Sequence, residues 1–508
     1  MTGPYLLGID VGTTMLKSML IDADGKIVHE ASYPYSVKHP NPLWAEQDPN
    51  DWWVGLKETV NKVTKGVSVK DVVSIGIDCL CPSLIAVDVE GKPQGNAIIW
   101  MDHRSVEQAE WIRKNVGEDL VFKVAGNSVA AGAFSATSIL WLKENRPKLF
   151  ERTRSFLHAN GYLTLKLTGK ATMDWTNASF TLLFDIRKRS WSEKLCELMD
   201  LPIEKLPALL PSWKVVGEVT LEAAREVGLA SGTPVIAGGA DTPCAAVGAG
   251  AVKVGSALDS SGTSTVLGVC TDNPVTDRRV MIRCHVVPDR WMYIAPSNFT
   301  GGSLRWFKEH FGQVESLSAE MFNLNPYELL DSEAEKSEPG AGGLIFLPYL
   351  AGERAPIWDP NAKGMLFGLT LNHTRSDVIR SILEGGAYAL RHNIETIEDL
   401  GVHIESIKVT GGPAKSRLWR KIKADVTGKK VVLPAVKEAS AFGSAILSGF
   451  GIGLYKDLTQ ASEELVSIED EISPNPEIHE RYSLLFDLYK KLYNPELMRR
   501  LNDILIRS

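Results

Sequence analysis

The chain opens with a strand-forming run that stops at an aspartate and a glycine turn. Residues 6–14 read Leu-Leu-Gly-Ile-Asp-Val-Gly-Thr-Thr, so Asp10 stands near the end of the apolar run and Gly12 precedes the hydroxyls of Thr13 and Thr14. A glycine lets backbone N–H groups come close to an anion, and threonine hydroxyls add further donors. This spacing predicts a phosphate-binding turn between two strands. The alternative is a strand-end aspartate that satisfies the amides of the turn.

Asp10 cannot itself attract a phosphate, because both groups are negatively charged. Carboxylate oxygens are ligands that Mg²⁺ prefers, so we expect Asp10 to hold a hydrated Mg²⁺ that bridges to the phosphate. Lys17 is the nearest early cation, and its place on the next strand favours a solvated lysine. Asp24-Gly25 is typical of a β-hairpin. A strand, a phosphate turn, a second strand and a hairpin form the opening of the actin-like ATPase fold.

The composition excludes several classes of protein. With 508 residues the chain is too long for one compact core, and we expect two domains. A net charge of −7 argues against a nucleic-acid-binding surface, and no apolar run approaches the length of a membrane span. The start has no signal-like segment, so we expect a cytoplasmic protein. The six cysteines suit a reducing compartment, and Cys79-Leu80-Cys81 does not have the pattern of a zinc site.

The second half repeats the opening pattern. Gly255–Ser261 is a predicted strand, Gly262-Thr263-Ser264 a turn, and Thr265–Cys270 a second strand. This predicts one nucleotide-binding unit in each of two domains. A third strand and glycine turn, Ile407–Gly412, precedes a helix that Ser416 caps. The elements alternate between strands and helices, which predicts an α/β fold.

The expected domains are residues 1–247 and 248–453, followed by a charged, helical appendage at 454–508. The join falls in the small-residue stretch Ala245–Ala251. Gly248 and Gly250 there either absorb a hinge motion or allow tight packing of a helix on a backbone.

A second carboxylate follows a glycine turn near the middle of the chain. Pro234–Ala237 is typical of a strand, and Gly238-Gly239 allows the backbone to approach a ligand closely. Asp241 follows where Thr242-Pro243 begins a helix. Asp241 is either the N-cap of that helix or a carboxylate that faces a ligand. Both roles are compatible, because a helix N-terminus keeps a carboxylate ionised.

Seven separated motifs occur in the order and at the spacing of one family, and on them the chain resembles the FGGY carbohydrate kinases over most of its length. They are Gly8–Thr14, Leu43–Trp53, Trp100–Arg104, Gly238–Asp241, Ser261–Ser264, Leu347–Pro356 and Thr410–Gly412. The resemblance implies two ribonuclease-H-like (actin-like ATPase) domains that face a deep cleft. It implies ATP-dependent phosphorylation of a sugar hydroxyl, a ketopentose such as D-xylulose first, with ATP and Mg²⁺ as cofactors. A homodimer is a further expectation from the family.

The resemblance also assigns roles to particular residues. Asp241 is the implied catalytic base, and Asp10 organises the Mg²⁺. The implied nucleotide-binding residues are Gly12, Thr13, Thr14, Gly262, Thr263 and Ser264 at the phosphates and Gly411, Gly412 and Ala414 at the adenosine. The implied sugar-binding residues are Cys81, Pro82, Asp102, Asp241 and Thr242.

The sugar itself is less constrained than the reaction. Members that phosphorylate xylulose carry a Met-His pair where this chain has Cys81-Pro82, and an Asn where it has Thr242. The Arg-Glu pair of glycerol-phosphorylating members is absent. Neither Cys81 nor Pro82 is a strong hydrogen-bond donor, so we predict that D-xylulose is bound less tightly or less selectively than by those relatives. Asp102 either contacts the sugar or forms a structural pair with Arg104. Kinases of another sugar, polyol or sugar acid, and a chaperone- or filament-like ATPase, are the alternatives.

Overall fold

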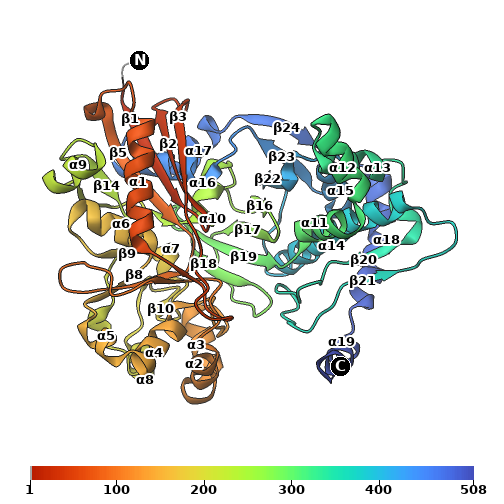
Figure 1. Ribbon diagram of the computed structural model, residues 1–508, viewed down its shortest axis with the longest axis horizontal. Coiled ribbons are helices and arrows are strands. Elements are labelled where there is room, and N and C mark those ends of the chain that lie inside the picture. The colour runs from red at the N-terminus through yellow and green to blue at the C-terminus, as the bar shows by residue number, and fades with distance from the viewer. Residues whose placement is uncertain (1–2, 508) are drawn as a thin grey trace. The chain divides into compact units, whose positions relative to one another are not determined.

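The computed structural model describes residues 3–507, which form two compact units (Figure 1). The first unit comprises the described residues of Met1–Val252, Cys270–Met292 and Glu438–Ser467, and the second those of Lys253–Val269, Tyr293–Lys437 and Ile468–Ser508. Each unit has its own sheet with helices packed on it, so the predicted α/β class is confirmed. Between residues 3 and 507, no helix has both the length and the apolar character needed to cross a bilayer.

The first unit contains most of the short strands and helices. Its strands are β1 (Tyr5–Val11), β2 (Met15–Asp22), β3 (Ile27–Pro34), β4 (Glu46–Gln47), β5 (Val72–Cys79), β6 (Ser83–Val87), β7 (Ala97–Ile99), β8 (Ser155–Leu157), β9 (Thr172–Asp174), β10 (Phe184–Asp185), β11 (Ser190–Trp191), β12 (Ala208–Leu210), β13 (Val215–Glu218), β14 (Pro234–Ile236), β15 (Gly239–Ala240) and β18 (Met281–Cys284). Its helices are α1 (Pro49–Val63), α2 (Val106–Trp111), α3 (Glu118–Ala125), α4 (Ser135–Asn145), α5 (Pro147–Arg152), α6 (Ala159–Thr168), α7 (Trp175–Ala178), α8 (Glu193–Leu198), α9 (Leu221–Val227), α10 (Asp241–Gly248), α16 (Ala439–Gly451) and α17 (Leu458–Leu465).

The main sheet of the first unit has the strand order β13-β14-β5-β1-β2-β3, with β15 also paired to β5. β1 runs antiparallel to β2 and parallel to β5. The predicted hairpin after β2 is present, and Gly25 adopts a φ of +78°, which glycine tolerates best. The predicted strands and hairpin at the opening of the chain are therefore confirmed.

Alternating residues of β1 face two different helices. Leu7, Ile9 and Val11 belong to the core that includes α1, which crosses one face of the sheet in Figure 1. Gly8 points to the opposite face, where a Cβ atom would come within 1.9 Å of the carbonyl oxygen of Ala441 in α16. The strand therefore needs glycine at this position. Helix α1 begins as its residues indicate, with Asp48 as the N-cap and Pro49 in the first turn: the Asp48 side chain accepts from the N–H of Asn50 at 3.0 Å.

The small residues before the expected domain junction allow close packing within the first unit. α10 lies against α16, and a Cβ at Gly248 would be 1.9 Å from the carbonyl oxygen of Ala439. Of the two interpretations of this stretch, tight helix packing is the one that the contacts of Gly248 favour.

The second unit has fewer, longer helices. Its strands are β16 (Ala257–Ser261), β17 (Thr265–Thr271), β19 (Trp291–Ser297), β20 (Ile345–Leu347), β21 (Met365–Phe367), β22 (Ser406–Thr410), β23 (Lys430–Pro434) and β24 (Ile468–Ile472), of which β17 and β19 also contribute residues to the first unit. Its helices are α11 (Thr300–Phe311), α12 (Gln313–Phe322), α13 (Pro326–Ala334), α14 (Arg375–Glu398), α15 (Arg417–Thr427), α18 (Pro476–Leu492) and α19 (Pro495–Arg507).

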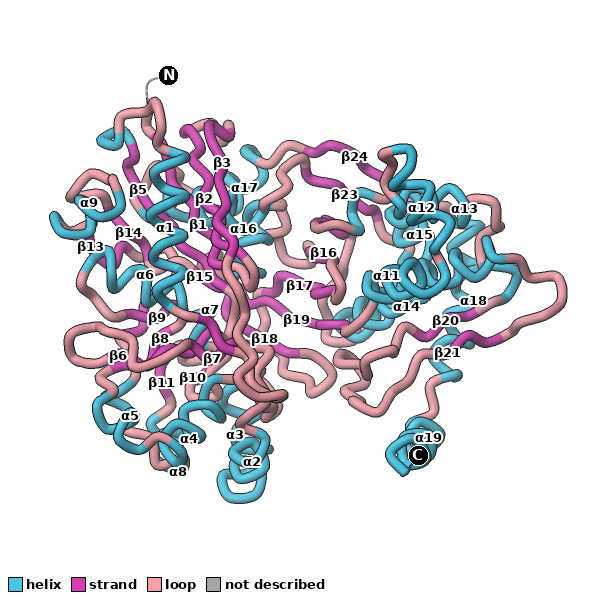
Figure 2. The backbone as a smooth tube through the Cα atoms, in the orientation of Figure 1, coloured by secondary structure: helices cyan, strands magenta, loops and turns pink. Residues whose placement is uncertain are grey.

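The sheet of the second unit repeats the pattern of the first (Figure 2). Its strands follow the order β19-β17-β16-β22-β23-β24, and β16 again runs antiparallel to the next strand and parallel to β22. The predicted repetition of the opening strand pattern is confirmed. The prediction that 454–508 is helical is wrong in one place, because β24 pairs antiparallel with β23. The segment of β24 reads Ile-Glu-Asp-Glu-Ile. Acidic residues are uncommon in strands, so the sequence did not indicate one here, and pairing with β23 stabilises it.

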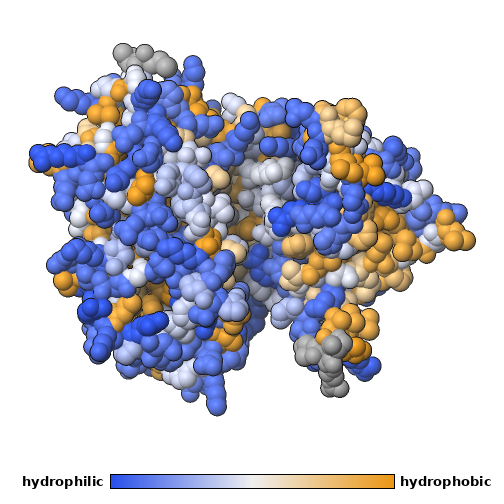
Figure 3. Space-filling model, in the orientation of Figure 1, coloured by the Kyte–Doolittle hydropathy of each residue, from blue (hydrophilic) through white to orange (hydrophobic). Residues whose placement is uncertain are grey.

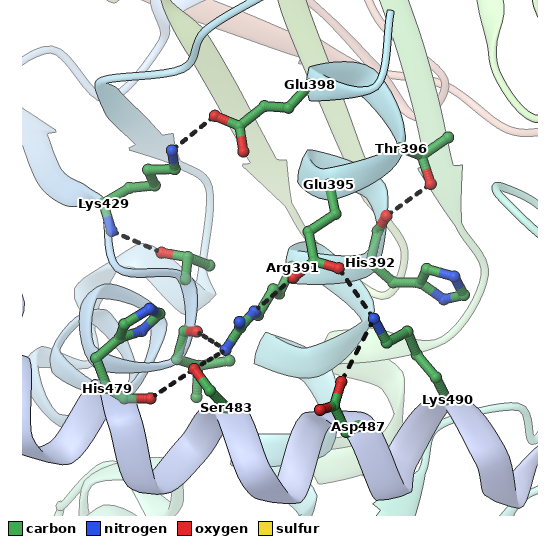
Figure 4. A network of polar contacts seen from close by, with 12 residues as sticks. Arg391, His392, Glu395, Thr396, Glu398, Lys429, His479, Ser483, Asp487 and Lys490 are labelled. Atoms are coloured by element: carbon green, nitrogen blue, oxygen red, sulfur yellow. Dashed lines mark hydrogen bonds and ion pairs between the residues drawn. The ribbon is translucent and has the colours of Figure 1, made fainter.

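Helix α18 is fastened to α14 by a polar network (Figure 4). Arg391 donates to Glu395 at 3.0 Å, to the carbonyl oxygen of Val426 at 3.1 Å and to the hydroxyl of Ser483 at 3.0 Å. Its guanidinium also lies 4.5 Å from the ring centre of Phe486. Elsewhere in this unit apolar side chains are exposed along α12, where Figure 3 shows hydrophobic surface.

Candidate active site

Three aspartates gather at one edge of the first unit's sheet. Asp10 in β1 is the direct parallel partner of Asp78 in β5. Asp78 in turn pairs with Gly239 in β15, and Asp241 follows that strand immediately. Because the carboxyl ends of parallel strands meet at the same edge, the two sequence-predicted aspartates lie in one site, together with Asp78, which the sequence pattern did not single out.

Asp241 is the first residue of α10, and the N-cap is Ala240, which has no side-chain acceptor. The interpretation of Asp241 as an N-cap is therefore wrong by one position. One carboxylate oxygen accepts from the N–H of Thr242 at 2.6 Å and from its hydroxyl at 3.1 Å. The side chain stays partly exposed, so a ligand can reach it. Burial raises the pKa of Asp241, while the positive charge of Arg283 and the two bonds from Thr242 oppose that rise.

Asp10 and Asp78 form a buried carboxyl pair. Burial raises the pKa of Asp10 to about 6. Burial, together with the negative charge of Asp10, raises the pKa of Asp78 well above the ordinary value of an aspartate. One oxygen of Asp78 accepts from Ser444 at 2.6 Å, and the other is buried without a donor. Lys17 is not a solvated lysine: its ammonium lies 2.6 Å from Glu438 and 3.7 Å from Asp10. The packing of α16, which Glu438 precedes, against β1 supplies this partner.

These carboxylates fit a magnesium ion that keeps other ligands. Within residues 3–507 there is no cluster of three or more His, Cys, Asp or Glu side chains that could hold a metal alone. Mg²⁺, however, is usually held by one or two carboxylates together with waters and substrate phosphates. The donor-less oxygen of Asp78 and the adjacent carboxyl of Asp10 match that chemistry.

The turn after β1 is held by neighbouring donors. The N–H of Gly12 donates to the carbonyl oxygen of Met15 at 3.0 Å, and Tyr35 donates its hydroxyl to the carbonyl of Gly12 at 2.6 Å. Trp100 donates to the hydroxyl of Thr13 at 3.2 Å. Thr14 is exposed, so its donors remain available to a ligand.

The predicted sugar-binding residues fall into two groups. Cys81 is partly exposed and follows β5, which places it near Asp241, and Pro82 beside it is buried. Asp102 is fully buried and pairs with Arg104 at 2.7 Å while it accepts from the N–H of Ala45 at 2.7 Å. These contacts favour the structural alternative for Asp102.

The second unit contains a cavity of about 710 Å³, which is large enough for a nucleotide. Two of the predicted glycines, Gly262 and Gly412, line it together with Thr263. Tyr327 and Asp331 also line it, and burial raises the pKa of Asp331 to about 6. Neither residue stood out in the sequence, because both come from a helix whose pattern is ordinary.

The two glycines after β22 differ in what they permit. Gly411 has a φ of +87°, and a Cβ there would be 2.1 Å from the carbonyl oxygen of Ser261. Gly412 has helical backbone angles, and nothing lies within 4 Å of a Cβ placed on it. Gly411 is therefore needed by the fold, whereas Gly412 faces open space at the cavity. Ala414, after these glycines, is buried. Ser264, the last residue of the turn Gly262–Ser264, is partly exposed.

Asp78, Arg283 and Glu438 are charged groups of the first-unit site that sequence reasoning missed. Asp78 directly follows the strand-forming run Val72–Ile77, so the sequence contains the same pattern of a strand followed by an aspartate as at Asp10. Arg283 lies in β18, more than forty residues beyond Asp241, and no local pattern links the two.

A duplicated ribonuclease-H-like fold with a carboxylate-lined sheet edge in one unit and a nucleotide-sized cavity in the other defines a phosphotransferase of the actin-like ATPase class. The family model described as the FGGY family of carbohydrate kinases matches here, its N-terminal domain over residues 5–248 and its C-terminal domain over 257–452. The chain belongs to this family and is an ATP-dependent carbohydrate kinase.

Several relatives resemble the chain over nearly its full length. A xylulose kinase of Staphylococcus epidermidis is 32% identical over 497 residues, which cover 97% of each chain. A gluconokinase of Bacillus subtilis is 30% identical and covers 91% of this chain and 90% of its own. The crystal structure of xylulose kinase from Rhodospirillum rubrum superposes with a TM-score of 0.90 at 28% identity, covering 96% of this chain and 98% of that one. The fold expected from the sequence is confirmed in both units.

Proposed function

We propose that this kinase transfers the γ-phosphate of ATP to a hydroxyl of a ketopentose such as D-xylulose, with Asp241 as the general base. The observation that carries the proposal is the position of Asp241: a partly exposed carboxylate at a helix N-terminus, on the same sheet edge as the Asp10–Asp78 pair. A base at such a site can accept a proton while remaining accessible to a sugar.

The transfer needs little covalent chemistry from the protein. The sugar hydroxyl gives its proton to the Asp241 carboxylate as its oxygen bonds to the γ-phosphorus, and the bond from that phosphorus to the bridging β,γ-oxygen breaks to release ADP. Thr242 orients the base through its N–H and hydroxyl. Cys81 and Pro82 form part of the sugar-binding wall.

ATP is proposed to bind in the cavity of the second unit. Gly262, Thr263 and Ser264 would bind phosphate oxygens through backbone N–H groups and hydroxyls, because their turn has the same form as Gly12–Thr14 in the first unit. Gly411, Gly412 and Ala414 would lie against the adenosine, where larger side chains would obstruct it.

Mg²⁺ is proposed to bind at Asp10, with Asp78 beside it. When bound, the ion would neutralise charge on the phosphate oxygens. Thr13 and Thr14 would add donors to the same phosphates, and Lys17 keeps the charge of the carboxyl pair partly balanced.

D-xylulose is the first substrate to test, because xylulose kinases are among the relatives most similar to this chain. The second candidate is another sugar, polyol or sugar acid, as the gluconokinase relatives suggest. The test is ADP release with a panel of pentuloses, hexuloses, polyols and aldonates. ATP hydrolysis at a rate that no sugar changes would refute the proposal and favour a chaperone-like ATPase.

The Asp241→Asn variant tests the base. It keeps the shape but removes the proton acceptor, so we expect the sugar-dependent rate to fall about 10²–10⁴-fold with little change in ATP affinity. Only the ionised form of Asp241 can accept the proton, and burial raises the pKa of this residue. As the pH is lowered, wild-type kcat/KM should therefore fall at a higher pH than it would for an ordinary aspartate. Asp457→Asn, at the N-cap of α17, is the matched control and should retain full activity. Near-normal turnover of Asp241→Asn would exclude Asp241 as the base.

A further inference from the structure

A buried arginine lies beside the proposed base and has no oxygen acceptor. Arg283 in β18 is 3% exposed, and its guanidinium carbon lies 3.8 Å from the ring centre of Phe180. Its Nε is buried without a hydrogen-bond partner. Within the described chain, no carboxylate forms an ion pair with it and no oxygen accepts a hydrogen bond from it, although it does hydrogen-bond the side chain of Cys81. An arginine has five N–H donors, so this is an incomplete site.

The neighbours of Arg283 are held in place by their own backbone bonds. The N–H of Ile282 donates to Asn127 at 3.0 Å, and the N–H of Cys284 donates to Ser179 at 3.0 Å. β18 is therefore fixed on both sides of the arginine, and the side chain is stacked on Phe180 rather than free to reach solvent. The guanidinium is preorganised where it stands.

The guanidinium faces the proposed sugar site, because it hydrogen-bonds the Cys81 side chain. The segment that follows β18 also lies against β15, since a Cβ at Gly239 would be 2.7 Å from Cγ1 of Val286. The charge of the guanidinium lowers the pKa of Asp241 and that of the Cys81 thiol, although burial raises the latter to about 12. Cys81 therefore stays a neutral thiol and a weak acceptor at neutral pH. His158, whose ring lies 3.9 Å from the Cys81 sulfur, has a pKa lowered by burial to about 4 and is also neutral. Two carboxylates act on this cluster, and both have other donors: Asp241 accepts from Thr242, and the buried Asp174 accepts from Thr176 and Asn177.

A guanidinium in this position favours a ligand with a planar anion. Burying a charge without an anionic partner is expensive. Stacking on one phenyl ring and a hydrogen bond to the weak acceptor Cys81 offset only part of that cost. Arginine binds carboxylates through two parallel N–H···O bonds, which are stronger than bonds to a neutral carbonyl or hydroxyl. A single guanidinium balances one negative charge, which matches a carboxylate better than a phosphate dianion next to Asp241.

We propose that Arg283 determines specificity by binding a substrate carboxylate, so that the enzyme phosphorylates aldonates, the open-chain sugar acids, in addition to neutral ketoses. This rests on the proposed function, because Asp241 must still take the proton of the attacked hydroxyl. The acid end of the aldonate accepts from Arg283, and the carbonyl end of a ketose binds the same guanidinium more weakly. Arg283 thus supplies the donor that Cys81-Pro82 lacks.

The test compares kcat/KM for D-xylonate, D-gluconate and D-xylulose with wild type, Arg283→Met and Arg283→Lys. Two charge-assisted hydrogen bonds disappear in Arg283→Met, so we expect aldonate kcat/KM to fall about 10²–10⁴-fold and D-xylulose kcat/KM less than about tenfold. Arg283→Lys keeps the positive charge but cannot form two parallel hydrogen bonds. Its aldonate kcat/KM should therefore lie between the values of wild type and of Arg283→Met. Arg189→Met is the control, because Arg189 also stacks on aromatic rings, at Trp175 and Trp291, and should leave both substrate classes unchanged.

Three results would overturn the inference, and they differ from one another. If wild type phosphorylates D-xylulose but no aldonate, the carboxylate-binding role is wrong while the proposed function stands. If Arg283→Met lowers kcat/KM equally for aldonates and for D-xylulose, and the acid-side decline of its pH–rate profile moves to higher pH, Arg283 acts by holding Asp241 ionised. If no sugar of either class supports ADP release, both proposals fail. Thermal unfolding checks that each variant is folded, and calorimetric titration of wild type with D-xylonate needs no variant.

Discussion

The buried ion pair behind the proposed phosphate-binding turn of the second unit gives the most quantitative prediction. The Lys423 ammonium in α15 lies 2.5 Å from a carboxylate oxygen of Asp259 in β16, and the two side chains are 5% and 0% exposed. Lys423 also donates to the hydroxyl of Ser261 at 3.1 Å, and that hydroxyl donates to Asp259 at 2.5 Å. Ser261 directly precedes the turn Gly262–Ser264, so the pair supports the loop proposed to bind ATP.

Lys423→Met removes the cation and leaves Asp259 charged and buried. Breaking a buried pair by removing one partner costs about 3–5 kcal/mol. For a unit of this size, each kcal/mol lowers Tm by about 2–4 °C, so the transition of the second unit should fall by about 6–20 °C. The ATP KM should rise as well, because Ser261 loses a partner next to the turn. Scanning calorimetry of the full chain measures the first effect and initial-rate kinetics at a temperature where the variant is folded measures the second.

Lys430→Met is the matched control for this pair. Lys430 contacts Glu471 at 3.3 Å with side chains 47% and 50% exposed, so its loss should cost about 1 kcal/mol or less. The double variant Lys423→Met with Asp259→Asn removes both charges and should recover part of the lost stability. If Lys423→Met unfolds no earlier than Lys430→Met, the buried pair does not hold this region and the reasoning is refuted.

Three further predictions address the metal, the cavity and the last helices. Asp10→Ala should abolish Mg²⁺-supported turnover and leave sugar binding nearly intact by calorimetry; an equal loss of sugar affinity would place Asp10 at the sugar instead. Gly412→Leu should raise the ATP KM at least about tenfold without lowering Tm, since its side chain enters the cavity, whereas Gly411→Ala should lower Tm. An unchanged KM for Gly412→Leu would exclude that cavity as the ATP site. Arg391→Met should lower the free energy of unfolding by about 1–3 kcal/mol, because it removes hydrogen bonds between α14 and its neighbours, and urea unfolding measures this loss. The control Arg500→Met changes an exposed side chain and should have no measurable effect. Equal effects of the two variants would contradict the structural role of Arg391.

Features that depend on a few neighbouring residues were predictable from the sequence. The strand before Asp10, the hairpin at Asp24-Gly25, the start of α1 at Asp48 and the glycine turn after β22 all follow from local rules on caps, turns and alternation. Recurrence of the first pattern at Gly262 also predicted that the chain contains two related sheets, which the strand orders confirm.

Features that depend on distant pairing were not predictable in the same way. Lys17 is paired because Glu438, more than four hundred residues later, comes back to its strand. Asp102 pairs with Arg104 and accepts from a backbone N–H. The sequence spacing alone did not decide between this structural role and a contact with the sugar. Arg283 reaches the site only because β18 belongs to the first unit, although the surrounding sequence belongs to the second. In each case a charge is placed by tertiary contacts, and hydrophobic periodicity carries no information about it.

The two copies of the glycine turn differ at the residues that meet across the parallel strands, and this difference predicts a different task for each of the two proposed phosphate-binding turns. Two positions before its glycine, the first copy has Asp10, paired with Asp78. The second copy has Ser260 at the same position, paired with Thr410. A carboxyl pair repels a bare phosphate and collects a cation, whereas a hydroxyl pair leaves the turn's N–H groups free to bind phosphate directly. We therefore expect the turn of the first unit to bind phosphate through a cation and the turn of the second unit to bind it directly.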